Sequence, residues 1–349
     1  MTKNFLEEYK KTKVTIDDLN TLRALAILLV VLRHCFAPYM KTWPVSEYYT
    51  YELFTDITGK YISTISMPLF VFISGFLFSY LRNKLKKYPT FQILLSKKIA
   101  RLLRPYIILA PIYILIFVNL NSILDFIQPL WKGAGHLWFL LMIFLVFILF
   151  YPLEIYFKKK PLKSFLLIVL GFFLYPGFSV IGLYPLAKVF HYLPFFYLGY
   201  FFHFKDEKII KKIGNKLWLF IPIHTILFIT SILAPKLITN GILKTFFIAY
   251  INLPLGIMSV SILFLIFTKN KNLKTLGNNL IVKNLNQTSY YIYLLHQPIL
   301  LFLFEIKFLQ TLPPLVVIIF GFLSTILVSF FLASILLKFY WSKKLIGAA

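Results

Sequence analysis

The sequence is poor in cysteine, in charge and above all in negative charge. A single cysteine among 349 residues, Cys35, excludes an internal disulfide and a metal cluster built on cysteine. Charged residues make up 14% of the chain, whereas soluble globular domains contain about 25%. Only 12 residues are acidic against 37 lysines and arginines, which gives a net charge of +25. This composition excludes disordered, collagen-like and coiled-coil proteins.

Apolar residues take the place of the missing charges. They make up 59% of the chain, more than a soluble globule of this length can bury. Because lipid solvates apolar surface, the sequence predicts an all-α polytopic membrane protein. We expect one transmembrane domain over residues 1–349, with no appended soluble domain. The stretches long enough to cross a bilayer, or nearly so, are 19–39, 61–81, 99–118, 137–157, 163–180, 185–204, 216–234, 245–268, 288–306 and 312–339.

The basic residues test this count because they gather in alternate connections between the predicted helices. The crowded segments are 3–13, 82–98, 158–163, 205–216, 269–283 and 343–344. Cytoplasmic loops are enriched in lysine and arginine, so we expect ten helices with both termini in the cytoplasm. The same rule, together with attraction to anionic lipid, explains the net charge without a nucleic-acid partner. We expect a multi-pass protein of the cell (plasma or inner) membrane. The longest connections, 40–60, 119–136 and 269–287, are predicted to be loops.

The first predicted helix carries ionisable side chains, which are costly inside a membrane. Arg23 and His34 are eleven residues apart, or about three turns plus 20°, so they share one face and lie roughly 16 Å apart along the axis. This pattern indicates a functional pair. The alternative is that both side chains extend to the nearest aqueous interface.

A second pair of cations opens the third predicted helix. Arg101 and Arg104 are three residues apart and therefore share a face. Only five of the 37 basic residues are arginine, so arginine is used selectively in this chain. A guanidinium presents a planar fork of donors that suits phosphate. The alternative is the ordinary charge of a cytoplasmic loop.

Several further positions are candidates for contacts with a substrate. The second predicted helix contains Ser74 beside a glycine, which permits close approach of a backbone or ligand. Interfacial aromatic residues usually only anchor a helix in the bilayer, which is the alternative for the tryptophan and tyrosine among these candidates. Glu305 is one of several acidic residues on the predicted outer side. The remaining candidates are His136, Trp138, Tyr293 and His296, and no group has the spacing of a metal site.

Taken in order, these segments resemble the membrane-bound acyltransferase 3 family, and most closely its stand-alone members similar to fucose 4-O-acetylase. The family motif of arginine, ten residues and histidine is present as Arg23 and His34. Its Arg-x-x-Arg motif is present as Arg101 and Arg104. The other segments that resemble the family are MPLFVFISGFLF (67–78), HLWFL (136–140), LPFFYLGYFF (193–202) and SYYIYLLHQP (289–298).

The resemblance implies transfer of an acyl group, usually acetyl, from cytoplasmic acyl-CoA to a carbohydrate hydroxyl. Arg101 and Arg104 would hold the CoA phosphates, and His34 would act as general base or acyl carrier. Arg23 would bind the donor or stabilise negative charge. The expected partners are the bilayer, acetyl-CoA or another short acyl-CoA, and a carbohydrate, with no permanently bound cofactor and no metal. The alternative is a polysaccharide or lipid-linked sugar exporter, in which the arginines and histidine would line a permeation path.

Overall fold

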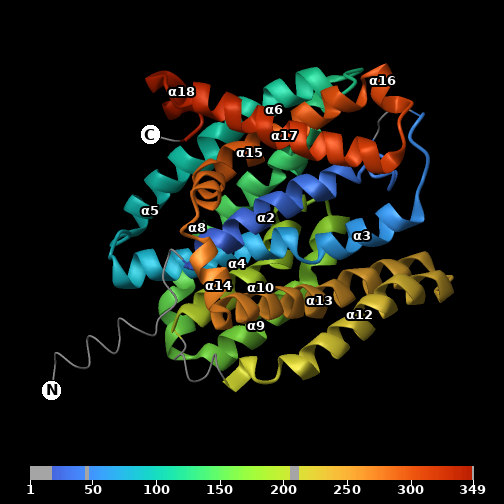
Figure 1. The fold of residues 1–349 in the computed structure, drawn as a ribbon. Helices are drawn as coiled ribbons and strands as arrows, with labels where there is room; N and C mark the ends of the chain where they lie inside the picture. Colours follow the sequence, from blue (N-terminus) through green and yellow to red (C-terminus); the bar gives the residue numbers. More distant parts are fainter. Residues whose placement is uncertain (1–17, 44–46, 205–211, 348–349) are drawn as a thin grey trace. The chain divides into compact units, whose positions relative to one another are not determined.

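The computed structural model describes residues 18–43, 47–204 and 212–347 (Figure 1). Within these ranges the regular structure is entirely helical, as predicted. Two π-helical turns, η1 (Tyr80–Lys84) and η2 (Ile99–Leu103), and one 3₁₀ turn, η3 (Gly135–Leu137), adjoin α-helices. The α-helices are α2 (Asp18–Cys35), α3 (Leu53–Ser63), α4 (Ser66–Ser79), α5 (Phe91–Lys98), α6 (Arg104–Phe117), α7 (Ile123–Lys132), α8 (Trp138–Lys159), α9 (Pro161–Val180), α10 (Tyr184–Phe204), α12 (Leu217–Leu237), α13 (Gly241–Lys269), α14 (Lys271–Leu276), α15 (Leu280–Phe304), α16 (Lys307–Gln310), α17 (Pro314–Leu336) and α18 (Tyr340–Leu345).

A helix covers each of the ten stretches predicted to cross the membrane. Among the described residues, seven helical segments are long and apolar enough to do so. Helices α2, α10 and α15 cover the other three stretches. The all-helical membrane class is confirmed, and the count of ten remains a prediction. The seven segments are Leu53–Lys84, Phe91–Phe117, Gly135–Lys159, Pro161–Val180, Leu217–Leu237, Gly241–Lys269 and Pro314–Leu336.

The prediction that the longest connections are loops is wrong in part. Helices α3, α7 and α14 lie in them, and α15 begins eight residues before the predicted start. Local capping explains α7. The Ser122 hydroxyl accepts from the Asp125 backbone N–H, while the Asp125 carboxylate accepts from the Ser122 backbone N–H and hydroxyl. These bonds stabilise the charged carboxylate and lower the pKa of Asp125. The basic segments 3–13 and 205–211 lie outside the described residues.

The chain divides into two compact units. Unit one comprises residues 1–33, 54–80 and 195–290, and unit two comprises 34–53, 81–194 and 291–349. The predicted single domain over residues 1–349 stays a prediction.

Unit one has an aromatic core. Phe72 of α4, Phe202 of α10 and Phe264 of α13 are buried, and the Phe264 ring lies 5.2 Å from each of the other two ring centroids. Helix α13 also packs along α12, as Figure 1 shows in yellow and orange. A hydrogen bond of 2.8 Å between His224 Nε2 and Ser259 Oγ joins those two helices. The core of unit one therefore combines phenylalanine packing with buried hydrogen bonds between helices.

Two glycines let α4 and α10 approach closely within unit one. A Cβ on Gly75 would lie 2.0 Å from the Phe196 carbonyl oxygen, and one on Gly199 would lie 1.9 Å from the Phe72 carbonyl oxygen. Each glycine thus faces the backbone of the other helix. This reciprocal contact is the role of small residues in membrane helix pairs, and it realises the close approach predicted beside Ser74.

In unit two, α8 packs against α5, η2 and α9, and α6 contacts α7, η3 and α18. The segment Phe91–Phe117 is a single helical run, formed by α5, η2 and α6. A π-turn inside such a run often accompanies a functional site. Here the π-turn contains Arg101.

We expect Gly75→Ala to destabilise the protein by about 1–3 kcal/mol, because the new methyl group overpacks the contact with the Phe196 backbone. Thermal unfolding in nanodiscs measures the effect. Gly177→Ala in α9 is the matched control, since no atom lies within 4 Å of its Cβ position. Equal melting temperatures for the two variants would show that the helices do not touch at Gly75.

Candidate active site

Three histidines lie together in unit two. His34 ends α2, His136 lies in η3 and His296 lies in α15. The His296 ring centroid is 4.8 Å from that of His34 and 4.8 Å from that of His136, both with edge-on geometry. His296 is fully buried, His136 is buried and His34 is half-buried. The fold therefore brings together candidates that are 102 and 160 residues apart in the sequence.

The ring, the backbone N–H and the carbonyl oxygen of His136 all contact residues of α15. Its Nε2 lies 3.0 Å from the Leu294 carbonyl oxygen, and its Nδ1 lies 2.9 Å from Gln297 Oε1. Its backbone N–H donates to the same Gln297 oxygen at 2.6 Å, and its carbonyl oxygen accepts from the Tyr293 hydroxyl. Proline cannot donate a backbone hydrogen bond, so Pro298 leaves the carbonyl of Leu294, four residues earlier, available to His136.

The turn before His136 depends on glycine. Gly135 has a φ of +46°, which favours glycine, and a Cβ there would lie 2.4 Å from the Tyr113 ring. The turn therefore lies directly against α6 and presents His136 to α15. The pattern GAG before HLW in the sequence is the signal for this turn.

His296 is held by its own helix. Its Nδ1 lies 2.7 Å from the Tyr293 carbonyl oxygen and 3.2 Å from that of Ile292. Both partners are acceptors, so Nδ1 carries the hydrogen and Nε2 carries the lone pair. Among the described residues, Nε2 has no hydrogen-bond partner although it is buried.

The segment after α2 covers the histidines from another side. The Trp43 ring lies 5.2 Å from the His34 ring and 6.3 Å from the Phe304 ring. The Tyr49 hydroxyl donates to the Phe304 carbonyl at 3.0 Å. Burial and the charge of Glu305 raise the pKa of Tyr49 to about 12, so this hydroxyl keeps its proton at neutral pH. Trp43, Tyr49 and Gln297 are site residues that the sequence reasoning missed.

Other predicted site residues in unit two lie beside this cluster. The Trp138 ring packs on Tyr192 at 5.5 Å, with the Lys188 ammonium 4.7 Å from the Trp138 ring centroid. Glu305 is exposed, and among the described residues it forms no ion pair with His34. Neither residue is part of the histidine contact.

Arg23 and Ser74 belong to unit one. A guanidinium nitrogen of Arg23 donates to Asn286 Oδ1 at 3.0 Å, and the Asn286 amide donates to Asn20 Oδ1 at 2.8 Å. The Ser74 hydroxyl donates to the Phe70 carbonyl of its own helix at 2.9 Å. Arg23 therefore donates to the neutral amide of Asn286, and the Ser74 hydroxyl bonds within its own helix.

Arg101 and Arg104 both donate to one segment of unit two, and their predicted contact with phosphate stays a prediction. Arg101 donates to the Gly347 carbonyl at 2.9 Å, and Arg104 donates to the Lys344 carbonyl at 3.3 Å. Gly347 has a φ of +71°, and a Cβ there would lie 2.7 Å from the Ala100 carbonyl oxygen. The two guanidinium groups thus bind neutral oxygens of the segment that follows α17.

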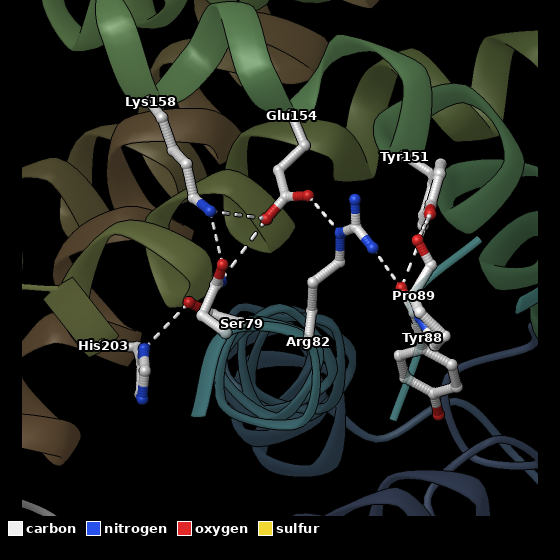
Figure 2. Close-up of polar contacts among 9 residues, drawn as sticks. Ser79, Arg82, Tyr88, Pro89, Tyr151, Glu154, Lys158 and His203 are labelled. Carbon is white, nitrogen blue, oxygen red and sulfur yellow. Dashed lines mark hydrogen bonds and ion pairs between the residues drawn. The ribbon is translucent and has the colours of Figure 1, made fainter. Parts of the chain in front are cut away.

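A buried ionic cluster lies at the other end of α8 and is drawn in Figure 2. Glu154 is 1% exposed and accepts from Arg82, while the Lys158 ammonium lies 3.4 Å from its second oxygen. Arg82 also donates to the Tyr88 carbonyl, and its guanidinium stacks 4.1 Å from the Tyr151 ring centroid. The sequence predicts Arg82 and Lys158 only as basic residues of cytoplasmic loops, and their pairing with Glu154 is visible only in the structure.

Comparison with known proteins identifies the family to which this chain is similar. Residues 16–334 match a family model described as "Acyltransferase domain". No curated protein and no solved structure matches the chain.

We expect Glu154→Gln to destabilise the protein by about 1.5–3 kcal/mol, the usual contribution of hydrogen bonds to a charged group, because it leaves the half-buried Arg82 without its counter-charge. Thermal unfolding in nanodiscs measures the loss. Asp125→Asn serves as the control, because that carboxylate is exposed and forms only a helix cap. If Glu154→Gln melts no earlier than Asp125→Asn, the buried cluster does not stabilise the fold.

Proposed function

The chain belongs to the acyltransferase 3 family, and from this premise we propose that it is an integral-membrane O-acyltransferase. It moves an acyl group, in our proposal acetyl, from cytoplasmic acyl-CoA to a hydroxyl of an extracytoplasmic carbohydrate. The resemblance to fucose 4-O-acetylase supports a sugar acceptor. The reaction uses no permanently bound cofactor.

The contact between His34 and His296 carries this proposal. Transfer to a hydroxyl requires a group that takes the hydroxyl proton, and imidazole is suited to this at neutral pH. His34 serves as general base or as the carrier of the acyl group. Arg23, on the same helix, binds the donor or stabilises the negative charge that develops on the reacting carbonyl.

Arg101 and Arg104 hold the phosphates of the donor. Each guanidinium group donates to a neutral carbonyl oxygen, and an anionic phosphate is a stronger acceptor than a carbonyl. In this proposal the segment around Gly347 yields its two hydrogen bonds to the donor.

The topology that we propose has ten membrane spans with both termini in the cytoplasm, in the plasma membrane. The ten helices at the predicted positions and the alternation of basic segments support it. The Arg101 pair then lies at the cytoplasmic face and His34 near the outer face, so the pantetheine arm runs between them.

The acceptor is held by side chains near the histidines in this proposal. His136, Tyr293 and His296 lie in the contact network, and Trp138 lies beside it. Glu305 and Ser74 are further candidates for this role.

We expect His34→Ala to lower acetyl transfer by about 10²–10⁴-fold, the usual contribution of a general base, while leaving the protein in the membrane. The assay follows labelled acetyl-CoA and a panel of methyl glycosides with protein in nanodiscs. His224→Gln is the control, since an amide can keep the hydrogen bond to Ser259. Full activity of His34→Ala would refute its role, and an inert wild type would favour the exporter.

We expect Arg101→Lys and Arg104→Lys each to raise the KM for acetyl-CoA by roughly 10–100-fold, because an ammonium does not replace a planar fork of donors. The KM for the glycoside should change little. Lys159→Arg, in which an exposed lysine changes, is the control. An unchanged KM for acetyl-CoA in both variants would leave the arginines with only their bonds to the segment around Gly347.

A further inference from the structure

The three histidine rings differ in which nitrogen atoms are available. Both ring nitrogens of His136 face hydrogen-bond partners, Gln297 and Leu294. Only Nδ1 of His296 does, through the carbonyls of Tyr293 and Ile292. His136 is therefore a fixed part of the scaffold, whereas His296 presents a lone pair at Nε2.

The position of that lone pair is specific. His296 is 0% exposed, and its ring lies 4.8 Å from the ring of His34 and 4.8 Å from that of His136. A buried acceptor without a donor is unfavourable, and buried polar atoms in proteins are almost always paired. The missing donor fits a hydroxyl group of a bound molecule, since each hydroxyl offers one O–H.

The orientation of the His296 ring does not depend on a ligand. Two carbonyls of α15 fix Nδ1, so Nε2 stays the acceptor in the neutral ring. In the same way, an oriented histidine in other enzymes is held by a hydrogen bond at its second nitrogen.

We propose that His296 Nε2 accepts the proton of the acceptor hydroxyl, and that the neighbouring His34 carries the acyl group. This inference rests on the proposed function and divides its chemistry between two residues. It selects the acyl-carrier role for His34, because the adjacent His296 supplies the base.

The first step forms an acyl-enzyme. A ring nitrogen of His34 attacks the thioester carbonyl, a C–N bond forms and the C–S bond breaks. The electron pair of that bond leaves on sulfur, and the thiolate takes the proton from the other ring nitrogen of His34. The products are acyl-His34 and free CoA.

The second step transfers the acyl group. The acceptor oxygen attacks the acyl carbon as its proton moves to His296 Nε2, a C–O bond forms and the C–N bond breaks. The electron pair returns to the His34 ring, which takes the proton from His296. The sum is one acyl-CoA and one alcohol giving one ester and one CoA, with both histidines restored.

The test compares His296→Gln with His34→Ala and wild type, using labelled acetyl-CoA and methyl glycosides in nanodiscs. Glutamine places an amide near the position of Nε2, so it can accept a hydrogen bond but cannot take a proton. We expect His296→Gln to release about one CoA per protein, to keep the label on the peptide that contains His34, and to lose ester formation by about 10²–10⁴-fold. His34→Ala should release no CoA.

Two results would overturn the inference. One is ester formation by His296→Gln at the wild-type rate. The other is the absence of the CoA burst in a His296→Gln protein that melts like the wild type. His224→Gln should match wild type in both readouts, because His224 lies in unit one and bonds to Ser259.

A second measurement separates this inference from the proposed function. Nitrogen-15 NMR of histidine-labelled protein, with His296→Gln to assign the signal, reports which ring nitrogen carries hydrogen. We expect a protonated Nδ1, and an unprotonated Nε2 whose resonance moves when methyl glycosides are added. A protonated Nε2, or a resonance that no glycoside moves, contradicts the inference, whereas an inert wild type with the expected spectrum contradicts only the acyl transfer.

Discussion

The contact between His136 Nε2 and the Leu294 carbonyl oxygen is the interaction on which the candidate site depends. Pro298 has no backbone N–H to donate to this oxygen within the helix. The oxygen therefore contacts His136 Nε2, which links the turn η3 to α15. Gln297 then binds the N–H and the ring of the same histidine. Because polar groups in a membrane interior must be paired, this set of bonds fixes the turn and the helix together. His296 lies on α15 between Leu294 and Gln297, so the same bonds also position its ring beside His136.

Buried polar groups lie at both ends of α8, and they are paired by different kinds of partner. At its N-terminal end the polar groups are histidine rings, an amide and backbone carbonyls. At its C-terminal end a full charge, Glu154, is buried and matched by Arg82 and Lys158. The residues 136 and 154 are about 27 Å apart along a helix, comparable with the thickness of the hydrocarbon core. A helix of this length can therefore place its two polar clusters near opposite faces of a bilayer.

The arginine pair has a structural role and, in our proposal, a second role in binding the donor. Arg101 and Arg104 hold the segment around Gly347 through carbonyl oxygens, which are weaker partners than carboxylates. In the proposed function, the phosphate groups of the donor replace these carbonyl oxygens as acceptors.

The sequence by itself determined the helical membrane class, the approximate place of the ten long helical stretches, and the spacing of Arg23 with His34 and of Arg101 with Arg104. These follow from composition and helical periodicity, which are local properties. Only the tertiary structure decided that His34, His136 and His296 touch, that Trp43 and Gln297 join them, and that Glu154 pairs with Arg82. Such contacts join residues far apart in the chain, and no periodicity encodes which helices become neighbours. Gly135 and Pro298 are local indications of a turn and of an unpaired helix carbonyl. The sequence does not show which residues contact these two features.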